Sequence, residues 1–392
     1  MSEESTFYLD HCGTTPLSAD VKKKLHELIG DDPFGNPSAS HHVLGQAAET
    51  IINESRATIA KSLDAKPDEI LFTGSATEAN NLILWGHALR FLGRSPRILF
   101  GATEHKSIYE ACVEIGERAL ATTESVAVKA NGEADLDHLE AILKEGRGRP
   151  TLVALMHINN EIPVRHPVES IADLCRQYDA SFHCDGVQGF VREDLRFAEG
   201  LYGSYVLSPH KIYGPKGIGV LVLGKHGLAP RIKAPYCGGD QEFGIRPGTH
   251  NTLAIAAAAT AITSHKTLRS QRVSNMRSCA DAFSETLLAK SPSVRLTLPI
   301  RAEAAGIVNF YVQGLDAPTL LAKIPHLCIN RGSSCLGANG EKYSHVPKAL
   351  GLPVEIQANV LRASFGEMNS PESSRRAAEI LARTIETIKS PD

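Results

Sequence analysis

Short apolar runs alternate with amphipathic segments through the first two thirds of the chain. The strand-like runs lie at residues 70–73, 97–100, 125–128, 152–156, 181–185, 203–207 and 220–223, and all but 181–185 are mainly apolar. Segments of helical period fill most of the intervals, at residues 78–91, 108–119, 135–144 and 168–178. This alternation predicts an α/β fold with a mainly parallel sheet covered by helices on both faces. In such sheets, ligands bind at the carboxyl ends of the strands.

The pattern changes after Asn251. Helical period covers residues 252–266 and 271–288, strand-like runs follow at 294–298 and 306–312, and a short helix is expected at 318–323. A last helix begins at Ser370-Pro371-Glu372, where an N-cap residue, a proline and an acid follow one another. We therefore predict a large sheet domain at residues 16–262. Residues 1–15 and 263–392 are expected to form a smaller α+β domain that carries a cysteine-containing loop.

Composition limits the function classes. The net charge of −3 argues against general nucleic-acid binding, which needs a basic face. The eight cysteines are dispersed and form no CxxC pair, which disfavours a zinc site and indicates a reducing compartment. The longest apolar run, 253–262, is too short to cross a bilayer, and the acidic start shows no apolar signal core. We expect a cytoplasmic protein with no membrane association.

Candidate chemistry centres on the stretch Ser208-Pro-His210-Lys211-Ile-Tyr-Gly-Pro-Lys-Gly. A lysine that lies between two strands of a buried sheet can form a Schiff base with a carbonyl cofactor. The neighbouring Ser208 and His210 indicate a phosphate nearby. Taken alone, the same stretch is equally compatible with a surface lysine in a basic turn.

Other motifs follow predicted strands. The turn Thr73-Gly-Ser-Ala76-Thr77 opens a helix, whose free N–H groups can bind a phosphate. His105 can stack on a flat ring or move protons, and Asn160 can donate to a phenolate oxygen. Each of these motifs is also compatible with an ordinary loop or turn.

Asp185 ends the predicted buried strand 181–185, where a carboxylate is costly unless it meets a positive partner such as a protonated pyridine nitrogen. Gln188 lies close enough in sequence to reach the oxygen of the same ring, although Asp185 can instead cap the next segment. Arg362 offers the planar fork that a carboxylate requires. Cys335 lies in a Gly/Ser-rich loop from which it can reach a substrate.

Together these motifs resemble the cysteine desulfurase and selenocysteine lyase family, a class-V aminotransferase-like group of pyridoxal 5'-phosphate enzymes with the aspartate aminotransferase fold (fold type I). The resemblance covers nearly the whole chain. It rests on Thr-Thr-Pro16, Phe34-Gly-Asn-Pro-Ser38, Thr77-Glu-Ala-Asn-Asn81, His210-Lys-Ile-Tyr-Gly-Pro-Lys-Gly and Arg246-Pro-Gly-Thr249.

The resemblance implies a role for each site residue. Lys211 binds the cofactor covalently, Asp185 pairs with its ring nitrogen, and His105 stacks on the ring. Arg362 and Asn160 contact the substrate, and Cys335 receives the sulfur. The remaining residues implied to bind the cofactor are Ala76, Thr77, Asn160, Gln188, Ser208, His210 and, from the other subunit of a homodimer, Thr249.

The implied activity is removal of sulfur from L-cysteine, which gives alanine and a persulfide on Cys335, with a sulfur- or selenium-accepting protein as partner. Asp10-His11-Cys12-Gly13 departs from the Asp-Asn-(Asn/Ala)-Ala start usual in the family, and Asp240, Phe243, His250 and Glu367 are further departures. A selenocysteine lyase is one alternative, indicated by Arg246-Pro247 and by the residues after Cys335. A carbon–sulfur β-lyase that gives pyruvate is another, and a scaffold without cofactor is a third.

Overall fold

The computed structural model describes residues 6–224, 232–299, 304–331 and 344–390. Within them the largest sheet has seven strands in the order β2-β8-β7-β6-β5-β3-β4. Only β8 runs antiparallel to its neighbours in this sheet, so the predicted mainly parallel α/β fold is confirmed. The strands are β2 (Ile70–Thr73), β3 (Arg97–Gly101), β4 (Thr122–Val126), β5 (Thr151–Met156), β6 (Ser181–Asp185), β7 (Ser204–Leu207) and β8 (Gly219–Leu223).

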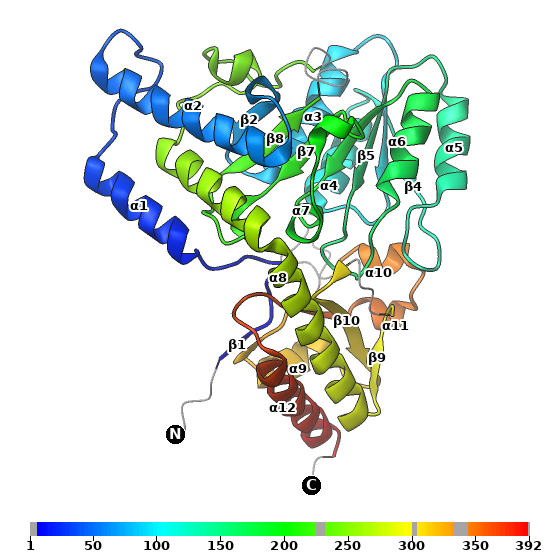
Figure 1. Cartoon of the computed structure of the whole chain (residues 1–392). Coiled ribbons are helices and arrows are strands. Elements are labelled where there is room, and N and C mark those ends of the chain that lie inside the picture. The colour runs from blue at the N-terminus through cyan, green and yellow to red at the C-terminus, as the bar shows by residue number, and fades with distance from the viewer. Residues whose placement is uncertain (1–5, 225–231, 300–303, 332–343, 391–392) are drawn as a thin grey trace.

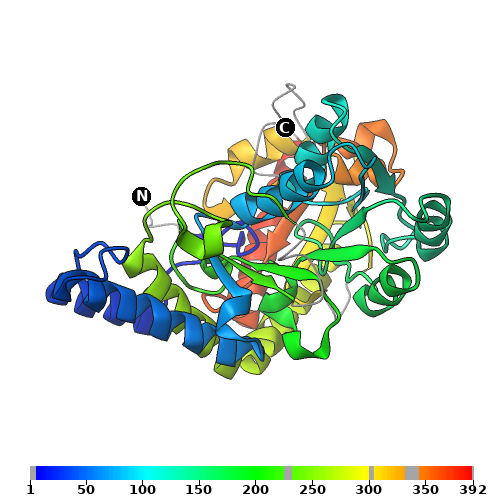
Figure 2. The same cartoon turned by 90° about the horizontal axis from the view of Figure 1, so that it is seen from above.

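Helices cover both faces of this sheet (Figure 2). Alternate residues of a strand point to opposite faces. On β5, Leu152 and Ala154 join a core with α3 and α4, whereas Val153 and Leu155 join a core with α2, α5, α6 and α8. The helices are α1 (Ala19–Asp31), α2 (Val43–Leu63), α3 (Ala76–Arg90), α4 (Lys106–Glu117), α5 (Leu136–Glu145), α6 (Val168–Gln177), α7 (Gly189–Arg192) and α8 (Thr252–Lys290).

A smaller α+β part lies below the large sheet in Figure 1. Its antiparallel sheet has the order β12-β10-β9, and the N-terminal β1 pairs with β11 in parallel. The strand β1, at the start of the described residues, therefore packs on the smaller part. The elements are β1 (Phe7–Tyr8), β9 (Val294–Leu296), β10 (Ile307–Val312), β11 (Leu327–Cys328), β12 (Leu361–Ser364), α9 (Ala317–Lys323), α10 (Val346–Ala349), α11 (Val354–Gln357) and α12 (Pro371–Lys389).

Two predictions about the elements are wrong. Residues 252–266 and 271–288 form one helix, α8, which runs from the large part into the small one (Figure 1). The interval contains no glycine or proline that would end the helix, and its residues are exposed or partly buried. The strand expected at 125–128 is β4, which begins at Thr122, because this edge strand pairs through its backbone and needs few apolar side chains.

In the described part of the chain, none of the helices combines the length and the apolar character that crossing a bilayer requires. The position along α8 at which one domain ends and the next begins stays a prediction.

Candidate active site

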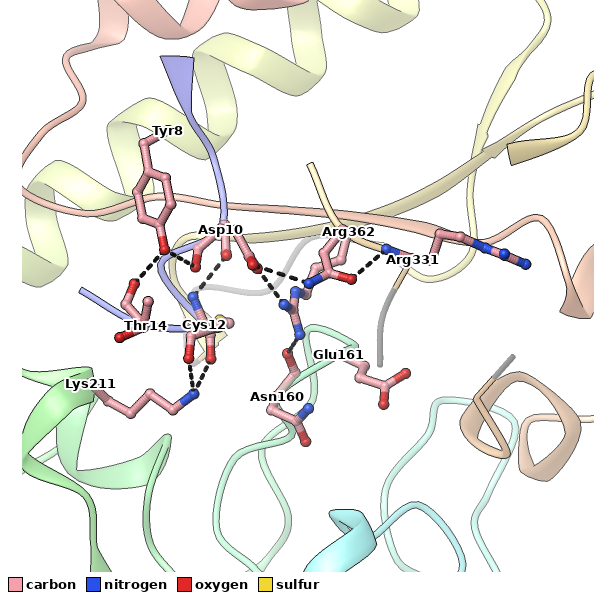
Figure 3. Close-up of polar contacts among 12 residues, drawn as sticks. Tyr8, Asp10, Cys12, Thr14, Asn160, Glu161, Lys211, Arg331 and Arg362 are labelled. Carbon is pink, nitrogen blue, oxygen red and sulfur yellow. Dashed lines mark hydrogen bonds and ion pairs between the residues drawn. The ribbon is translucent and has the colours of Figure 1, made fainter. Parts of the chain in front are cut away.

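The loops after β2, β3, β5, β6 and β7 meet at one edge of the large sheet, because these strands run parallel. Most of the predicted site residues lie on these loops. The turn after β1 and the strand β12 approach the same edge from the smaller part, as Figure 3 shows for Cys12 and Arg362 opposite Lys211 and Asn160.

Lys211 lies just after β7, at the end of a short 3-10 turn (Pro209–Lys211). Its Nζ donates to the carbonyl oxygens of Cys12, at 2.6 Å, and Gly13, at 2.5 Å (Figure 3). Burial lowers the pKa of Lys211 to about 8. At pH 7, roughly a tenth of such a side chain is the free amine, far more than for an exposed lysine. This lysine can therefore act both as a nucleophile towards an aldehyde and as a base.

Gln188 contacts the same turn as Lys211. Its Nε2 donates to the carbonyl oxygen of Cys12 at 3.2 Å, and its Oε1 accepts from Nη1 of Arg192 at 2.7 Å. Arg192 is buried and also donates through Nε to the carbonyl oxygen of Ala305. The structure thus brings Gln188 beside the lysine, while its predicted contact with a cofactor ring stays a prediction.

Asp185 is the last residue of β6 and is buried. Its Oδ2 accepts from Nδ2 of Asn80 at 2.9 Å, and its Oδ1 accepts from the backbone N–H of Val187 at 3.0 Å. Each carboxylate oxygen can accept a second hydrogen bond. Asp185 is therefore able to receive an N–H from a cationic ring, which is the environment that the sequence predicts.

Asn80 links Asp185 to a second buried residue, His183. The Oδ1 of Asn80 lies 3.0 Å from Nε2 of His183, whose pKa burial lowers to about 3. His183 is therefore neutral at pH 7. An amide oxygen can only accept, so Nε2 of His183 carries the proton.

His105 is the N-cap of α4, and its Nδ1 accepts from the backbone N–H of Ser107 at 3.1 Å. The Ser107 hydroxyl accepts from Nδ2 of Asn80 at 2.8 Å and lies 2.8 Å from the same Nδ1. The Ser107 hydroxyl therefore donates a hydrogen bond to Nδ1 of His105. Burial lowers the pKa of His105. The neutral ring thus carries its proton on Nε2.

Ala76 and Thr77 open α3, where Ser75 caps the helix. Backbone N–H groups in the first turn of a helix have no partner within the helix, and the helix dipole favours an anion there. Thr77 is exposed at this turn. These positions are compatible with the predicted phosphate cup.

Ser208 and His210 flank the approach to Lys211. Ser208 is buried, and Nδ1 of His210 lies 3.0 Å from the hydroxyl oxygen of Thr14. Burial, together with the Lys211 charge, lowers the pKa of His210 to about 3. His210 is therefore neutral at pH 7 and can contact an anion only as a hydrogen-bonding group.

Arg362 lies on β12 and is only 2% exposed. Its Nη1 donates to the carbonyl oxygen of Asn160 at 2.7 Å, and its Nη2 lies 2.5 Å from Oδ1 of Asp10 (Figure 3). The neighbouring Asn159 ties its turn to Thr103 and to the backbone N–H of Glu161. Arg362 and Asn160 thus lie together, while their predicted contacts with the substrate stay predictions.

Two predicted residues stand apart. Thr249 is exposed on the loop before α8, and no hydrogen bond among the described residues joins it to Lys211. This loop is anchored elsewhere, by the buried ion pair between Glu242 and Arg56. Cys335 lies outside the described residues, and the segment before it is placed only as far as Arg331.

Sequence reasoning assigned no role to Asn80, Ser107 or Asp10. Asn80 and Ser107 each lie close in sequence to a predicted residue, on helices that begin at the same sheet edge. Asp10 follows a strand-like run, which is the signal that singled out Asp185. Its partner Arg362 is 352 residues away, so a local pattern could not connect them.

The comparisons with known proteins agree with this geometry. The model of the aminotransferase class-V family matches residues 7–374. The cysteine desulfurase IscS of Pectobacterium carotovorum is 32% identical over 381 residues, which cover 96% of this chain and 92% of that protein. IscS of Neisseria meningitidis serogroup C (strain 053442) is 31% identical over 387 residues, with coverage of 98% and 93%.

Two solved structures are also similar. A NifS-like protein from Rickettsia africae has a TM-score of 0.82 and 27% identity, and the match covers 98% of this chain and 99% of that one. A structure described as SspA in complex with cysteine has a TM-score of 0.77 and 27% identity, with coverage of 92% and 99%. The chain therefore belongs to the class-V aminotransferase family and, within it, to the cysteine desulfurase family. The family resemblance of the sequence and the fold type are confirmed.

Proposed function

We propose that the protein is a pyridoxal 5'-phosphate-dependent cysteine desulfurase that converts L-cysteine to alanine and leaves the sulfur on Cys335. The observation that carries the proposal is the partly buried Lys211, whose pKa is lowered to about 8, at the sheet edge where Asp185 ends β6. The relatives named IscS and the neighbour described with cysteine support the same substrate.

The residues present fit pyridoxal phosphate. Lys211 offers an amine for its aldehyde, Asp185 an acceptor for its ring N–H, and the start of α3 a set of N–H donors for its phosphate. Gln188 and His105 are the proposed neighbours of its ring, and Ser208 and His210 further phosphate contacts. When bound, the cofactor supplies an electron sink next to the substrate Cα.

The chain's own residues then move protons and sulfur. Lys211 takes the Cα proton, which its lowered pKa permits near neutral pH. Arg362 binds the substrate carboxylate beside Asn160. The Cys335 thiolate bonds to the substrate sulfur as the Cβ–S bond breaks, and the electron pair left on carbon takes up a proton to give alanine.

Anaerobic incubation of the holoenzyme with L-cysteine tests the proposal. We expect alanine in the solution and a mass increase of one sulfur atom on the peptide that contains Cys335. The variant Cys335→Ser should lose the persulfide, whereas Cys237→Ser, which removes an exposed cysteine elsewhere, should not. Pyruvate instead of alanine, or alanine from selenocysteine but not from cysteine, would contradict it.

We also propose a homodimer. Several large apolar side chains are exposed on α1, α2 and the loops beside them, among them Phe34, Val43 and Phe243. Exposed apolar patches of this kind indicate protein–protein contacts. In the dimer, Thr249 reaches the phosphate site of the partner. Light scattering checks the oligomeric state, and a monomer that binds the cofactor normally would contradict the role of Thr249.

A sulfur- or selenium-accepting protein and a cytoplasmic location complete the proposal. The seven described cysteines are free thiols, which supports a reducing compartment. We also propose that the large domain, residues 16–262, holds the cofactor and that the remaining residues carry the loop with Cys335.

A further inference from the structure

Asp10 places a carboxylate on the arginine that is proposed to bind substrate. One oxygen, Oδ1, lies 2.5 Å from Nη2 of Arg362, and the other, Oδ2, accepts from Nδ2 of Asn330 at 3.0 Å (Figure 3). The Asp10 side chain is 21% exposed, whereas that of Arg362 is 2% exposed. The pair therefore joins a buried cation to an anion that still reaches water.

A buried guanidinium requires a counter-charge, because an unpaired ion in the interior loses its hydration without compensation. In the substrate-free protein, Asp10 supplies this charge and the backbone carbonyl of Asn160 takes a further N–H. An amino-acid substrate brings a carboxylate of its own. Two carboxylates on one guanidinium repel each other, so the second carboxylate binds with less favourable free energy than the first.

Gly13 makes the room that Asp10 occupies. A Cβ at position 13 would lie 2.4 Å from Oδ2 of Asp10 and 2.8 Å from its Cγ. Neither distance is compatible with van der Waals contact, so any larger residue at position 13 has to push the carboxylate aside. The position of the Asp10 carboxylate on Arg362 therefore depends on the glycine at position 13.

We infer that Asp10 is a specificity-determining residue, an internal carboxylate that occupies Arg362 until the α-carboxylate of the substrate displaces it. The inference rests on the proposed function of Arg362. If Arg362 is free only part of the time, the apparent affinity for a carboxylate ligand falls by that fraction. The arrangement lowers affinity for amino acids in general and leaves ligands without a carboxylate unaffected.

The test compares the wild-type holoenzyme with Asp10→Asn. We expect the KM for L-cysteine to fall about tenfold, which corresponds to ~1.4 kcal/mol, with kcat changed less than about twofold because Asp10 does not touch the reacting atoms. Inhibition by cysteamine, which has the amine and thiol of cysteine but no carboxylate, should not change. Asp20→Asn, which removes an exposed carboxylate on α1, is the matched control and should leave KM unchanged.

Gly13→Ala gives a second, independent perturbation that keeps the Asp10 charge. It should tighten the binding of L-alanine, measured by titration calorimetry, by a factor similar to that of Asp10→Asn. A KM that rises or stays the same in both variants, or an equal change for cysteamine, would overturn the inference. Alanine that does not bind the wild type would overturn it as well.

These readouts separate the inference from the proposed function. If the wild type binds alanine but forms no persulfide on Cys335, the proposed reaction fails, while the calorimetry still decides the role of Asp10.

Discussion

Replacement of Asn80 by leucine tests how the site holds its two key groups. Asn80 is fully buried on α3. Its Nδ2 donates to Asp185 at 2.9 Å and to Ser107 at 2.8 Å, and its Oδ1 lies 3.0 Å from Nε2 of His183. One amide thus connects the carboxylate at the end of β6, through Ser107, to the histidine at the start of α4. Leucine has a similar volume and can make none of these bonds.

The cost follows from the groups left without a partner. The variant leaves a buried N–H on His183 and a buried carboxylate oxygen on Asp185, each worth about 1–3 kcal/mol when a hydrogen-bond partner is removed. We therefore expect Asn80→Leu to lower the free energy of unfolding by about 2–5 kcal/mol. The Ser107 hydroxyl also loses its donor Asn80 and becomes freer to turn away from His105.

Urea unfolding of the apoprotein measures the loss in free energy of unfolding, and steady-state kinetics of the holoenzyme measures kcat and KM. We expect kcat to fall with little change in KM, because Asn80 acts through Asp185 and His105 and does not contact the substrate carboxylate. The neighbouring Asn81→Leu is the control, since Asn81 is partly exposed and should cost less than about 1 kcal/mol. Equal losses of unfolding free energy and of kcat in Asn80→Leu and Asn81→Leu would refute the reasoning.

Three further predictions use other features. The pKa of about 8 for Lys211 predicts how fast the apoprotein binds pyridoxal phosphate: the rate should rise about tenfold for each pH unit of increase below pH 8 and level off above it, because it follows the free amine. A rate that does not change with pH across this range, measured by stopped-flow absorbance, would contradict this prediction. His183 has a pKa of about 3 in the folded protein, against 6.5 for an unperturbed histidine. Between these two values the unfolded chain binds more protons, so lowering the pH below 6.5 should lower the stability, with a slope from this residue that approaches about 1.4 kcal/mol per pH unit, measured by urea unfolding between pH 7 and 5. Glu242→Gln breaks the buried pair with Arg56 and should cost about 3 kcal/mol or more, whereas Glu27→Gln, in an exposed pair, should cost less than about 0.5 kcal/mol in the same assay.

The sequence predicts the sheet well because its signal is local. Strands that are buried along their whole length, such as β5, appear as nearly continuous apolar runs. The motifs with polar or charged groups follow these runs directly. The carboxyl ends of parallel strands lie at one edge of a sheet, so strand direction alone predicts that Lys211, Asp185 and His105 lie at the same edge. Side-chain packing is not needed for this prediction.

The break predicted within α8 shows where a local signal misleads. The interval between Lys266 and Gln271 resembles a loop because it is mainly polar, with Leu268 as its one apolar residue. Its side chains are exposed or partly buried, and a helix without proline or glycine continues through such a stretch. Burial thus depends on the tertiary environment, while the backbone follows residue propensity.

The turn Asp10–Gly13 is the part of the site that sequence reasoning could not place. Its contacts to Lys211 and Arg362 join residues about two hundred or more positions apart, and two of them use backbone carbonyls, which every residue has. The same turn holds several departures from the family pattern, whereas Lys211, Asp185 and Arg362 follow that pattern. The turn contacts both the lysine proposed to react with the cofactor and the arginine proposed to bind the substrate. Changes in the turn can therefore alter substrate affinity while the proposed reacting groups remain. Differences in substrate preference between this protein and its relatives are therefore expected to map to this turn rather than to the sheet edge.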